Sequence, residues 1–248
     1  MPVIYEPRGK AREYSELACN LYSGCLHKCR YCYCPSILRK SLDEWSSNSK
    51  ARTNILKQFE NDAKKLFKTE KELLFCFMSD PYQDDEAAFI IRQALLICEK
   101  YRFKNVQILT KAGFRAIKDF DILKRNGWKF GSTIIFRSDN FRKEWELNAP
   151  SIESRYEAVR VAYKNGIYTW VSIEPVINPD EALKVMQDLR GHVNKWKIGK
   201  LNHFPEIEKN INWNKFYYQA KDILKNENIY WKKDLLLAAN INFEQSQS

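Results

Sequence analysis

The chain has 248 residues, 44% of them hydrophobic and 29% charged, which predicts one folded domain over residues 1–248 with a buried core. The sequence lacks a secretory signal pattern and any run of about eighteen uncharged apolar residues, so we expect a cytoplasmic protein without a membrane partner. A net charge of +10 makes nucleic acid a candidate partner, although the basic residues are spread along the chain as on an ordinary solvated surface.

Strand and helix signals alternate along the chain. Strands are predicted at 17–22, 73–78, 106–109, 128–136, 167–173, 195–198 and 228–232. Helical patterns lie at 85–101, 114–125, 151–165, 180–189 and 214–226. This alternation predicts parallel strands joined by right-handed crossovers. Six or seven strands are too few for an eight-stranded barrel, so the predicted fold class is α/β, a partial (β/α)6-type barrel with mostly parallel strands, in which residues 200–248 form a C-terminal extension.

Polar side chains follow several of these strands. Ser79 and Asp80 come after the second strand, Lys111 after the third and Glu174 after the fifth. Folds with parallel strands carry their chemistry at the carboxyl ends of the strands. Cys25 follows the first strand in the same way, so we expect these side chains to converge on one face of the protein.

Four of the seven cysteines fall within ten residues. Three of them form the segment Cys25-Leu-His-Lys-Cys29-Arg-Tyr-Cys32, in a loop after the first strand. In a reducing compartment such clustering indicates metal binding rather than disulfides. Three thiolates would hold three irons of a [4Fe-4S] cubane and leave the fourth iron open to chelate a substrate such as S-adenosylmethionine. A zinc site completed by Cys34 or His27 is the alternative.

The Cys-x3-Cys-x2-Cys spacing resembles the signature of the radical SAM superfamily. Tyr31 occupies the aromatic position before the third cysteine, where that family contacts the adenine. The likeness extends to a subgroup that includes spore photoproduct lyase and short phage-associated relatives, and it covers roughly residues 18–200. The segments that carry it are 20–25, 31–33, 79–83, 108–111, 148–155 and 172–175.

The resemblance implies an enzyme with a [4Fe-4S] cluster and S-adenosylmethionine as cofactors. A flavodoxin or ferredoxin would reduce the cluster, and S-adenosylmethionine would be cleaved to methionine and a 5′-deoxyadenosyl radical that abstracts hydrogen from a substrate. A nucleic acid or nucleotide is one substrate class, with a DNA repair-like reaction, and a small metabolite or protein side chain is the other; a lyase-type and a transferase-type outcome both stay open. A different class of function is a basic nucleic-acid-binding protein with a structural or electron-relay iron–sulfur or zinc site.

Carried over to this sequence, the resemblance assigns cofactor contacts to residues at the strand ends. Ser79 and Asp80 would lie at the methionine amino group, Lys111 at the carboxylate, and Ser132 or its neighbours at the ribose. An ammonium at a strand end suits a carboxylate on chemical grounds as well. Glu174 would bind the cofactor or substrate, or pair with a lysine.

The candidates for hydrogen transfer differ from the pattern of the lyases. There, a cysteine on the second strand returns a hydrogen atom to the product, whereas Cys76 here is one residue out of place and is predicted to face the core. Tyr33 matches a tyrosine used in radical transfer, or else packs around the cluster. Cys34 is an added thiol that would serve as a hydrogen donor or be inert. The tryptophans that suit stacking of a displaced base, or else core packing, are Trp145, Trp170 and Trp196.

Overall fold

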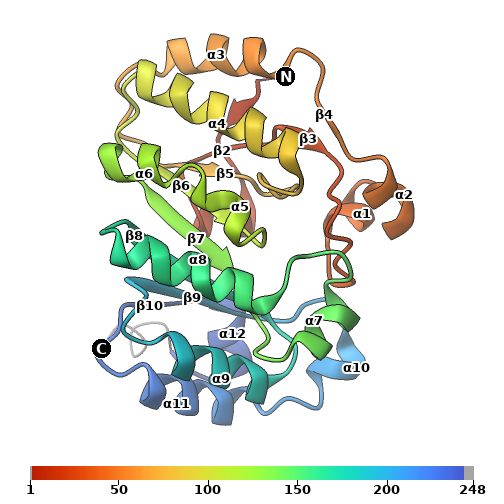
Figure 1. Cartoon of the computed structure of the whole chain (residues 1–248). Helices are drawn as coiled ribbons and strands as arrows, with labels where there is room; N and C mark the ends of the chain where they lie inside the picture. Colours follow the sequence, from red (N-terminus) through yellow and green to blue (C-terminus); the bar gives the residue numbers. More distant parts are fainter. Residues whose placement is uncertain (1, 243–248) are drawn as a thin grey trace.

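The computed structural model describes residues 2–242, and its centre is an open sheet of eight strands (Figure 1). In spatial order the strands are β1 (Ile4–Tyr5), β2 (Leu17–Cys19), β5 (Leu73–Phe75), β6 (Val106–Thr110), β7 (Lys129–Thr133), β8 (Tyr168–Val176), β9 (Lys195–Lys200) and β10 (Ile229–Trp231). The edge strand β1 pairs antiparallel with β2, and the other neighbouring pairs of this sheet are parallel. A small antiparallel pair, β3 (Tyr22–Ser23) and β4 (Lys50–Ala51), lies outside it.

Helices connect the strands, and α4, α8 and α9 lie in front of the sheet in Figure 1. The longer helices are α3 (Ile55–Lys65), α4 (Asp85–Lys100), α8 (Ile152–Lys164), α9 (Pro179–Leu189) and α11 (Trp213–Ile223). The shorter ones are η1 (Gly9–Glu13), α1 (Cys34–Ile37), α2 (Leu42–Ser47), α5 (Phe114–Ile117), α6 (Phe120–Asn126), α7 (Asp139–Trp145), α10 (Pro205–Glu208) and α12 (Lys233–Ala238). No helix in the described part of the chain is long and apolar enough to cross a membrane.

The two faces of the sheet bury different side chains. On β7, Phe130 packs against Phe120 of α6 with ring centroids 4.9 Å apart, so it faces the helices. Its neighbour Gly131 faces the opposite, inner side, where an added Cβ would lie 2.2 Å from the Trp170 ring. Tyr14 lies on that side too, with its ring 6.2 Å from that of Trp170. Aromatic side chains therefore fill the inner face at this level.

Lys197 on β9 is buried on the inner face. Its ammonium lies 4.5 Å from the centroid of Trp170 and 4.6 Å from that of Tyr14, and it donates to the Tyr14 carbonyl at 3.2 Å. Burial lowers the pKa of Lys197 from its ordinary value of 10.5 to about 7. Folding must therefore either bury the ammonium, below the folded pKa, or remove its proton, above it. This destabilising effect is full below the folded pKa and disappears as the pH rises toward the unfolded pKa.

We expect Lys197→Met to raise the free energy of unfolding at about pH 7, because a neutral side chain avoids this deprotonation. The difference between the variant and the wild type should shrink as the pH approaches about 10, where both states of Lys197 lose the proton. Urea denaturation at several pH values measures both curves. A difference that stays constant with pH would contradict the prediction.

The predicted fold class is confirmed. Seven parallel strands lie at the positions of the seven predicted strands, and the sheet stays open. The predicted strand 17–22 is divided between β2 and β3, which pair with different partners. The sequence interpretation missed β1, β4 and α3. Residues beyond 200 supply β10, which pairs with β9 in the main sheet, while the assignment of a single domain stays a prediction.

The predicted helix 114–125 is two helices, α5 and α6. The break falls at Lys118 and Asp119. The Asp119 carboxylate is held there by the Tyr82 phenol at 2.9 Å and by Arg92 at 2.7 Å. These tertiary contacts stabilise a turn that helical periodicity does not reveal.

Candidate functional site

The three cysteines of the motif lie in the loop between β3 and α1. Cys29 is buried and its backbone forms an antiparallel bridge with Glu146, while Cys25 and Cys32 are half-buried. The thiols interact electrostatically with one another: Cys29 with Cys25 and Cys32, and Cys25 with Cys32. The folded chain thus gathers three thiols in one short loop.

The three thiols differ in acidity. Burial raises the pKa of Cys25 to about 12 and also raises the pKa of Cys29. By contrast, a hydrogen bond with the Cys34 thiol lowers the pKa of Cys32 to about 7. Because the thiolate is the form that binds metal, Cys32 is the most readily available ligand of the three at neutral pH, and a bound cation would favour the thiolate at the others.

Gly24 shapes the turn that enters this loop. Its φ is +98°, and an added Cβ would lie 2.6 Å from Ser49 Cα and 2.7 Å from the Trp45 carbonyl oxygen. We expect Gly24→Ala to lower the free energy of unfolding by about 2–4 kcal/mol, because the backbone on both sides must shift. Iron incorporation should fall with it, measured beside urea denaturation.

The matched control for that substitution is Gly166→Ala. Gly166 also has a positive φ, +74°, but an added Cβ would meet nothing within 4 Å. Its alanine variant should lose only about 1 kcal/mol and keep normal iron incorporation. Equal losses of stability and of iron in the two variants would contradict the role given to Gly24.

Asp80 fastens the cysteine loop to the ends of β5 and β6. Its carboxylate accepts hydrogen bonds from the Thr110 hydroxyl at 2.7 Å, the Lys111 amide at 2.7 Å and the Tyr82 amide at 2.9 Å. His27 Nε2, from the loop itself, lies 3.1 Å from the same carboxylate. Burial raises the pKa of Asp80, but His27 and these hydrogen bonds outweigh it and hold the pKa well below its usual range. The Asp80 oxygens are therefore occupied within the protein.

Beside the loop, the Gln83 side-chain NH2, the Ser79 hydroxyl and the Lys111 ammonium each lack a hydrogen-bond partner in the described part of the chain. The Ser79 hydroxyl is buried and makes no hydrogen bond there. The Lys111 ammonium lies 5.6 Å from the centroid of the Tyr31 ring and makes no hydrogen bond or ion pair with a described residue. Burial would lower the pKa of Lys111, but Cys29 and Glu146 hold that pKa above its usual value. A hydroxyl and a cation thus remain free beside the three thiols.

A buried ion pair, Glu146 with Arg155, holds the phenol of Tyr31 by a hydrogen bond. Glu146 and Arg155 are both fully buried, with Arg155 Nη1 2.6 Å from Glu146 Oε2. Arg155 also donates to the carbonyls of Thr133 at 3.2 Å and Pro150 at 3.0 Å, and the Tyr31 phenol donates to Glu146. The sequence interpretation missed Glu146. Arg155 lies in the segment 148–155 that carried the family resemblance, which was the only signal for this pair.

Ser132 does not face the site. It shares its face of β7 with Phe130, is fully buried, and donates a hydrogen bond to the Thr110 carbonyl at 3.2 Å. Its neighbour Thr133 is on the inner side of the strand, together with Gly131. Of the residues predicted at the ribose, the neighbour is therefore the better placed.

Glu174 lies on β8 among residues of the inner face. It accepts a hydrogen bond from the Tyr14 phenol and is 3.8 Å from the Lys232 ammonium. An added Cβ at Gly199 would lie 2.7 Å from the carboxyl carbon of Glu174, so the backbone of β9 packs closely against the Glu174 side chain. Its recorded partners in the described chain are thus a tyrosine and a lysine, in line with the pairing considered from the sequence.

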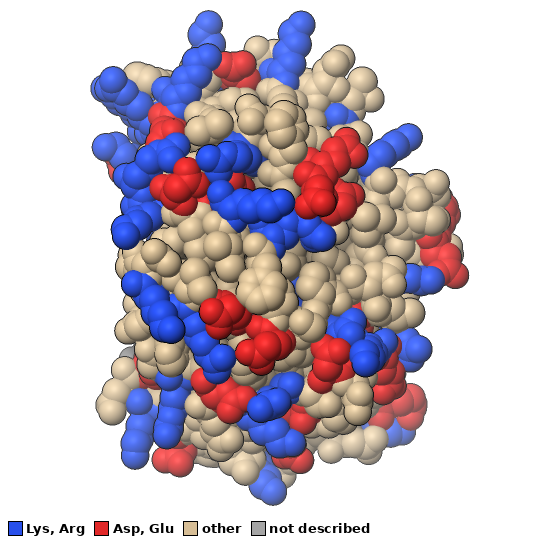
Figure 2. Space-filling view, viewed as in Figure 1, with Lys and Arg blue, Asp and Glu red and all other residues tan. Residues whose placement is uncertain are grey.

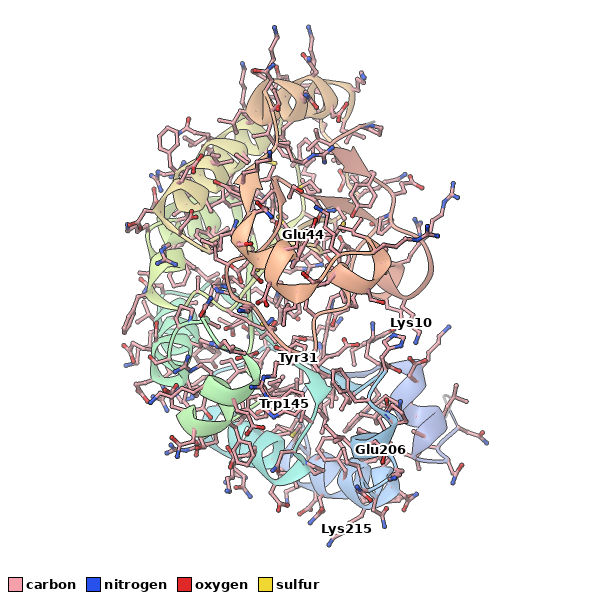
Figure 3. All side chains as sticks on the ribbon, turned by 90° about the vertical axis from the view of Figure 1, so that its right-hand side faces the viewer. Lys10, Tyr31, Glu44, Trp145, Glu206 and Lys215 are labelled. Atoms are coloured by element: carbon pink, nitrogen blue, oxygen red, sulfur yellow. The ribbon has the colours of Figure 1, made fainter. Side chains whose placement is uncertain are left out.

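The hydrogen-transfer candidates are held by local contacts. Cys34 is buried and hydrogen-bonds through its thiol to Cys32. Tyr33 is exposed, and its phenol donates to the Phe77 carbonyl at 3.1 Å. Cys76 is buried in the core, which confirms the prediction for that residue. Trp170 and Trp196 are buried, whereas Trp145 is half-buried; Figure 3 shows it just below Tyr31 at the centre of the face that carries α2 and Glu44.

These residues fit a cluster with three thiolate ligands and an amino acid bound beside it. Among the described residues, no three His, Cys, Asp or Glu side chains converge tightly enough for one metal ion. A cubane presents separate irons to separate thiolates, so its ligands stand farther apart than those of a single ion. The free Lys111 ammonium can donate to the carboxylate of such an amino acid, and the free Ser79 hydroxyl can accept from its amino group.

Known proteins and structures resemble this chain in sequence and fold. Residues 19–193 match the Radical SAM superfamily. An uncharacterized protein of Methanocaldococcus jannaschii is 29% identical over 163 residues, which cover 65% of this chain and 60% of that protein. Spore photoproduct lyase with a cysteine-to-alanine substitution has a TM-score of 0.68 at 14% identity, over 90% of this chain and 78% of that chain. Streptococcus suis SuiB bound to S-adenosylmethionine has a TM-score of 0.62 at 12% identity, over 89% and 51%.

The likeness to the lyase and to SuiB is one of fold, because the sequence identity is low. The family match spans most of the chain, and the chain spans 60% of the length of its archaeal relative. The region that matches the family, residues 19–193, includes the cysteine loop, the Asp80 network and the inner face of β8. The chain belongs to the radical SAM superfamily, whose members use a [4Fe-4S] cluster and S-adenosylmethionine.

Proposed function

We propose that Cys25, Cys29 and Cys32 hold the [4Fe-4S] cluster of this enzyme, and that it cleaves S-adenosylmethionine to abstract hydrogen from a substrate. The observation that carries the proposal is the pair of free polar groups, the Ser79 hydroxyl and the Lys111 ammonium, beside the three thiols. When bound and reduced, the cluster supplies one electron that breaks a sulfonium bond of S-adenosylmethionine and yields methionine and a 5′-deoxyadenosyl radical. The protein supplies binding and orientation.

Each neighbouring residue has a proposed task. Lys111 binds the carboxylate and Ser79 the amino group of the methionine part, Tyr31 lies at the adenine, and Thr133 serves the ribose in place of Ser132. The support for Lys111 and Ser79 is that both lack a partner in the described chain. The hydrogen-transfer roles of Cys34 and Tyr33 and the cofactor or substrate role of Glu174 stay predictions.

Asp80 is proposed as a positioning residue rather than a contact to the amino group. Its two oxygens already serve Thr110, Lys111, Tyr82 and His27. Through His27 it keeps the cysteine loop against the strand ends. The loop is therefore fixed before a cofactor arrives, which lowers the entropy that binding must overcome.

The test is formation of 5′-deoxyadenosine. The protein is purified without oxygen, reconstituted with iron and sulfide, reduced with dithionite and given S-adenosylmethionine. We expect 5′-deoxyadenosine and methionine in equal amounts. An intact cluster by visible absorbance with no 5′-deoxyadenosine would contradict the proposal and favour an electron-relay or structural site in a nucleic-acid-binding protein.

Lys111→Met should weaken S-adenosylmethionine binding by about 10- to 100-fold, the usual range for a lost hydrogen bond to a charged group. Equilibrium dialysis against labelled S-adenosylmethionine, on the cluster-loaded protein, measures it. Lys118→Met is the control, because Lys118 is exposed at the end of α5 and, among the residues that the structure describes, its one ion pair is with Asp85 at 3.6 Å. Unchanged affinity in Lys111→Met would remove that residue from the site.

For the substrate, we propose a nucleic acid or nucleotide. The support is the net charge of +10 and the aromatic pair Trp145 and Phe204, whose ring centroids are 5.8 Å apart on the side of the site. On the face in Figure 2, basic side chains are interspersed with acidic ones, so this face offers no continuous basic stripe. The proposal therefore places the nucleic acid on the side shown in Figure 3, around Tyr31 and Trp145.

Binding to a fluorescent single-stranded oligonucleotide at rising salt tests the substrate class. Affinity should fall steeply with salt, because phosphate contacts release counterions. Trp145→Ala should weaken binding by about fivefold or more, the effect of losing one stacked base. Absence of salt-dependent binding would contradict the nucleic-acid proposal and leave the radical chemistry itself untouched.

A further inference from the structure

The surface of α1, next to the cysteine loop, carries exposed apolar side chains. Tyr33 is 44% exposed, Ile37 67% and Leu38 41%. We call these three residues the α1 patch. Scattered exposed apolar residues are ordinary on a protein surface, but a group of them beside a functional site indicates a surface that another molecule covers.

The α1 patch is close to the cysteine ligands along the chain. Tyr33 follows Cys32 directly, and α1 begins at Cys34, whose thiol hydrogen-bonds to Cys32. The solvent-exposed ring thus belongs to the residue directly after a cysteine that is proposed to bind iron. Electron transfer between proteins weakens steeply with distance, so a carrier bound at this patch would have a short path to the cluster.

The charges around the α1 patch are positive. Arg30 lies in the loop before it and Arg39 follows it, both are exposed, and neither side chain makes a hydrogen bond or ion pair with a described residue. The nearby acids on α2, Asp43 and Glu44, each pair with a lysine, at 2.5 and 3.3 Å. The patch therefore has an apolar centre with an excess of positive charge at its edge, which complements an acidic partner.

We propose that the α1 patch is the docking face for an acidic, FMN-containing electron carrier of the flavodoxin type. This inference rests on the proposed function, because a catalytic cluster must be reduced in every turnover that consumes S-adenosylmethionine. The apolar edge of the flavin ring would meet Tyr33, Ile37 and Leu38, and acidic side chains of the carrier would meet Arg30 and Arg39. One electron leaves the reduced flavin and enters the cluster, so the flavin is oxidised by one electron and the cluster is reduced by one.

The test compares Ile37→Glu with Leu237→Glu. Both residues are exposed aliphatic side chains, 67% and 74%, but Leu237 lies on α12, outside the patch. Titration calorimetry of the cluster-loaded protein with a purified flavodoxin should show binding about tenfold weaker in Ile37→Glu and unchanged in Leu237→Glu. In stopped flow, reduced flavodoxin should bleach the cluster of Ile37→Glu about tenfold more slowly, while dithionite bleaches all three proteins at equal rates.

Equal flavodoxin affinity in the wild type and Ile37→Glu would overturn the docking face. So would a loss of reduction that is the same with dithionite, because that result indicates damage to the cluster. If flavodoxin binds and reduces the wild type in the expected manner but no 5′-deoxyadenosine forms, the docking face is supported and the proposed radical activity fails. A patch that binds an oligonucleotide in competition with flavodoxin, with unchanged flavodoxin affinity in Ile37→Glu, would assign it to nucleic acid instead.

Discussion

Cys29→Ala is expected to abolish both the cluster and the formation of 5′-deoxyadenosine. Removal of one of three thiolates leaves two ligands, too few to hold a cubane that already has an open iron. The substitution keeps the backbone bridge between residue 29 and Glu146, so the loop retains its anchor. Iron and sulfide content, visible absorbance and chromatographic detection of 5′-deoxyadenosine should all fall to background.

Cys98→Ala is the control for this experiment. Cys98 is a free, fully buried cysteine on α4 that packs in the core. Its loss should lower the free energy of unfolding by about 1 kcal/mol and leave the iron content unchanged. If Cys29→Ala kept full iron and activity, the ligand set would have to be reassigned, with Cys34 as the next thiol in the loop.

The second large effect is expected from Arg155→Met. Arg155 is fully buried and lies 2.6 Å from the equally buried Glu146, so its loss leaves an unpaired carboxylate without solvent. Breaking a buried ion pair on one side lowers the free energy of unfolding by about 3–5 kcal/mol. Urea denaturation measures it. Arg160→Met on the same helix, where Arg160 and Glu153 stand 3.7 Å apart at the surface, should change it by about 0.5 kcal/mol or less.

A double variant separates the charge effect from a packing effect. Arg155→Met with Glu146→Leu removes both charges and should recover part of the lost stability, because replacing a whole buried pair by apolar side chains is often close to neutral. The recovery should be incomplete, since the Tyr31 phenol and the carbonyl of Pro150 lose a partner. A double variant no more stable than Arg155→Met would show that packing, not the unpaired charge, dominates.

Sequence reasoning located the strands well, because most of the parallel strands are largely buried and rich in apolar residues, although β9 and β10 are less so. It missed β1 and β4, whose two residues each are too short to show a pattern. It offered Ser132 or its neighbours for the ribose, and strand periodicity sets Ser132 on the face of Phe130. Among those neighbours, alternation along β7 favours Thr133, on the inner side of the strand.

The site divides in the same way. The cysteine spacing carries its own chemistry, so those three residues were accessible from the sequence alone. The contact of His27 with Asp80 joins residues more than fifty positions apart, and no local pattern in either segment predicts it. Glu146 is the C-cap residue of the short helix α7, and only the folded chain shows that it is fully buried and accepts a hydrogen bond from the Tyr31 phenol.

The aromatic filling of the inner face bears on how a substrate is chosen. Tyr14 and Trp170 occupy that side of the sheet, with Lys197 between them. A substrate therefore does not have to be small enough to fit into an enclosed cavity there. It needs only to extend one carbon–hydrogen bond as far as the rim. Under the proposed function, such an enzyme would select by reach rather than by enclosure, which agrees with a group that projects from a long polymer such as the proposed nucleic acid.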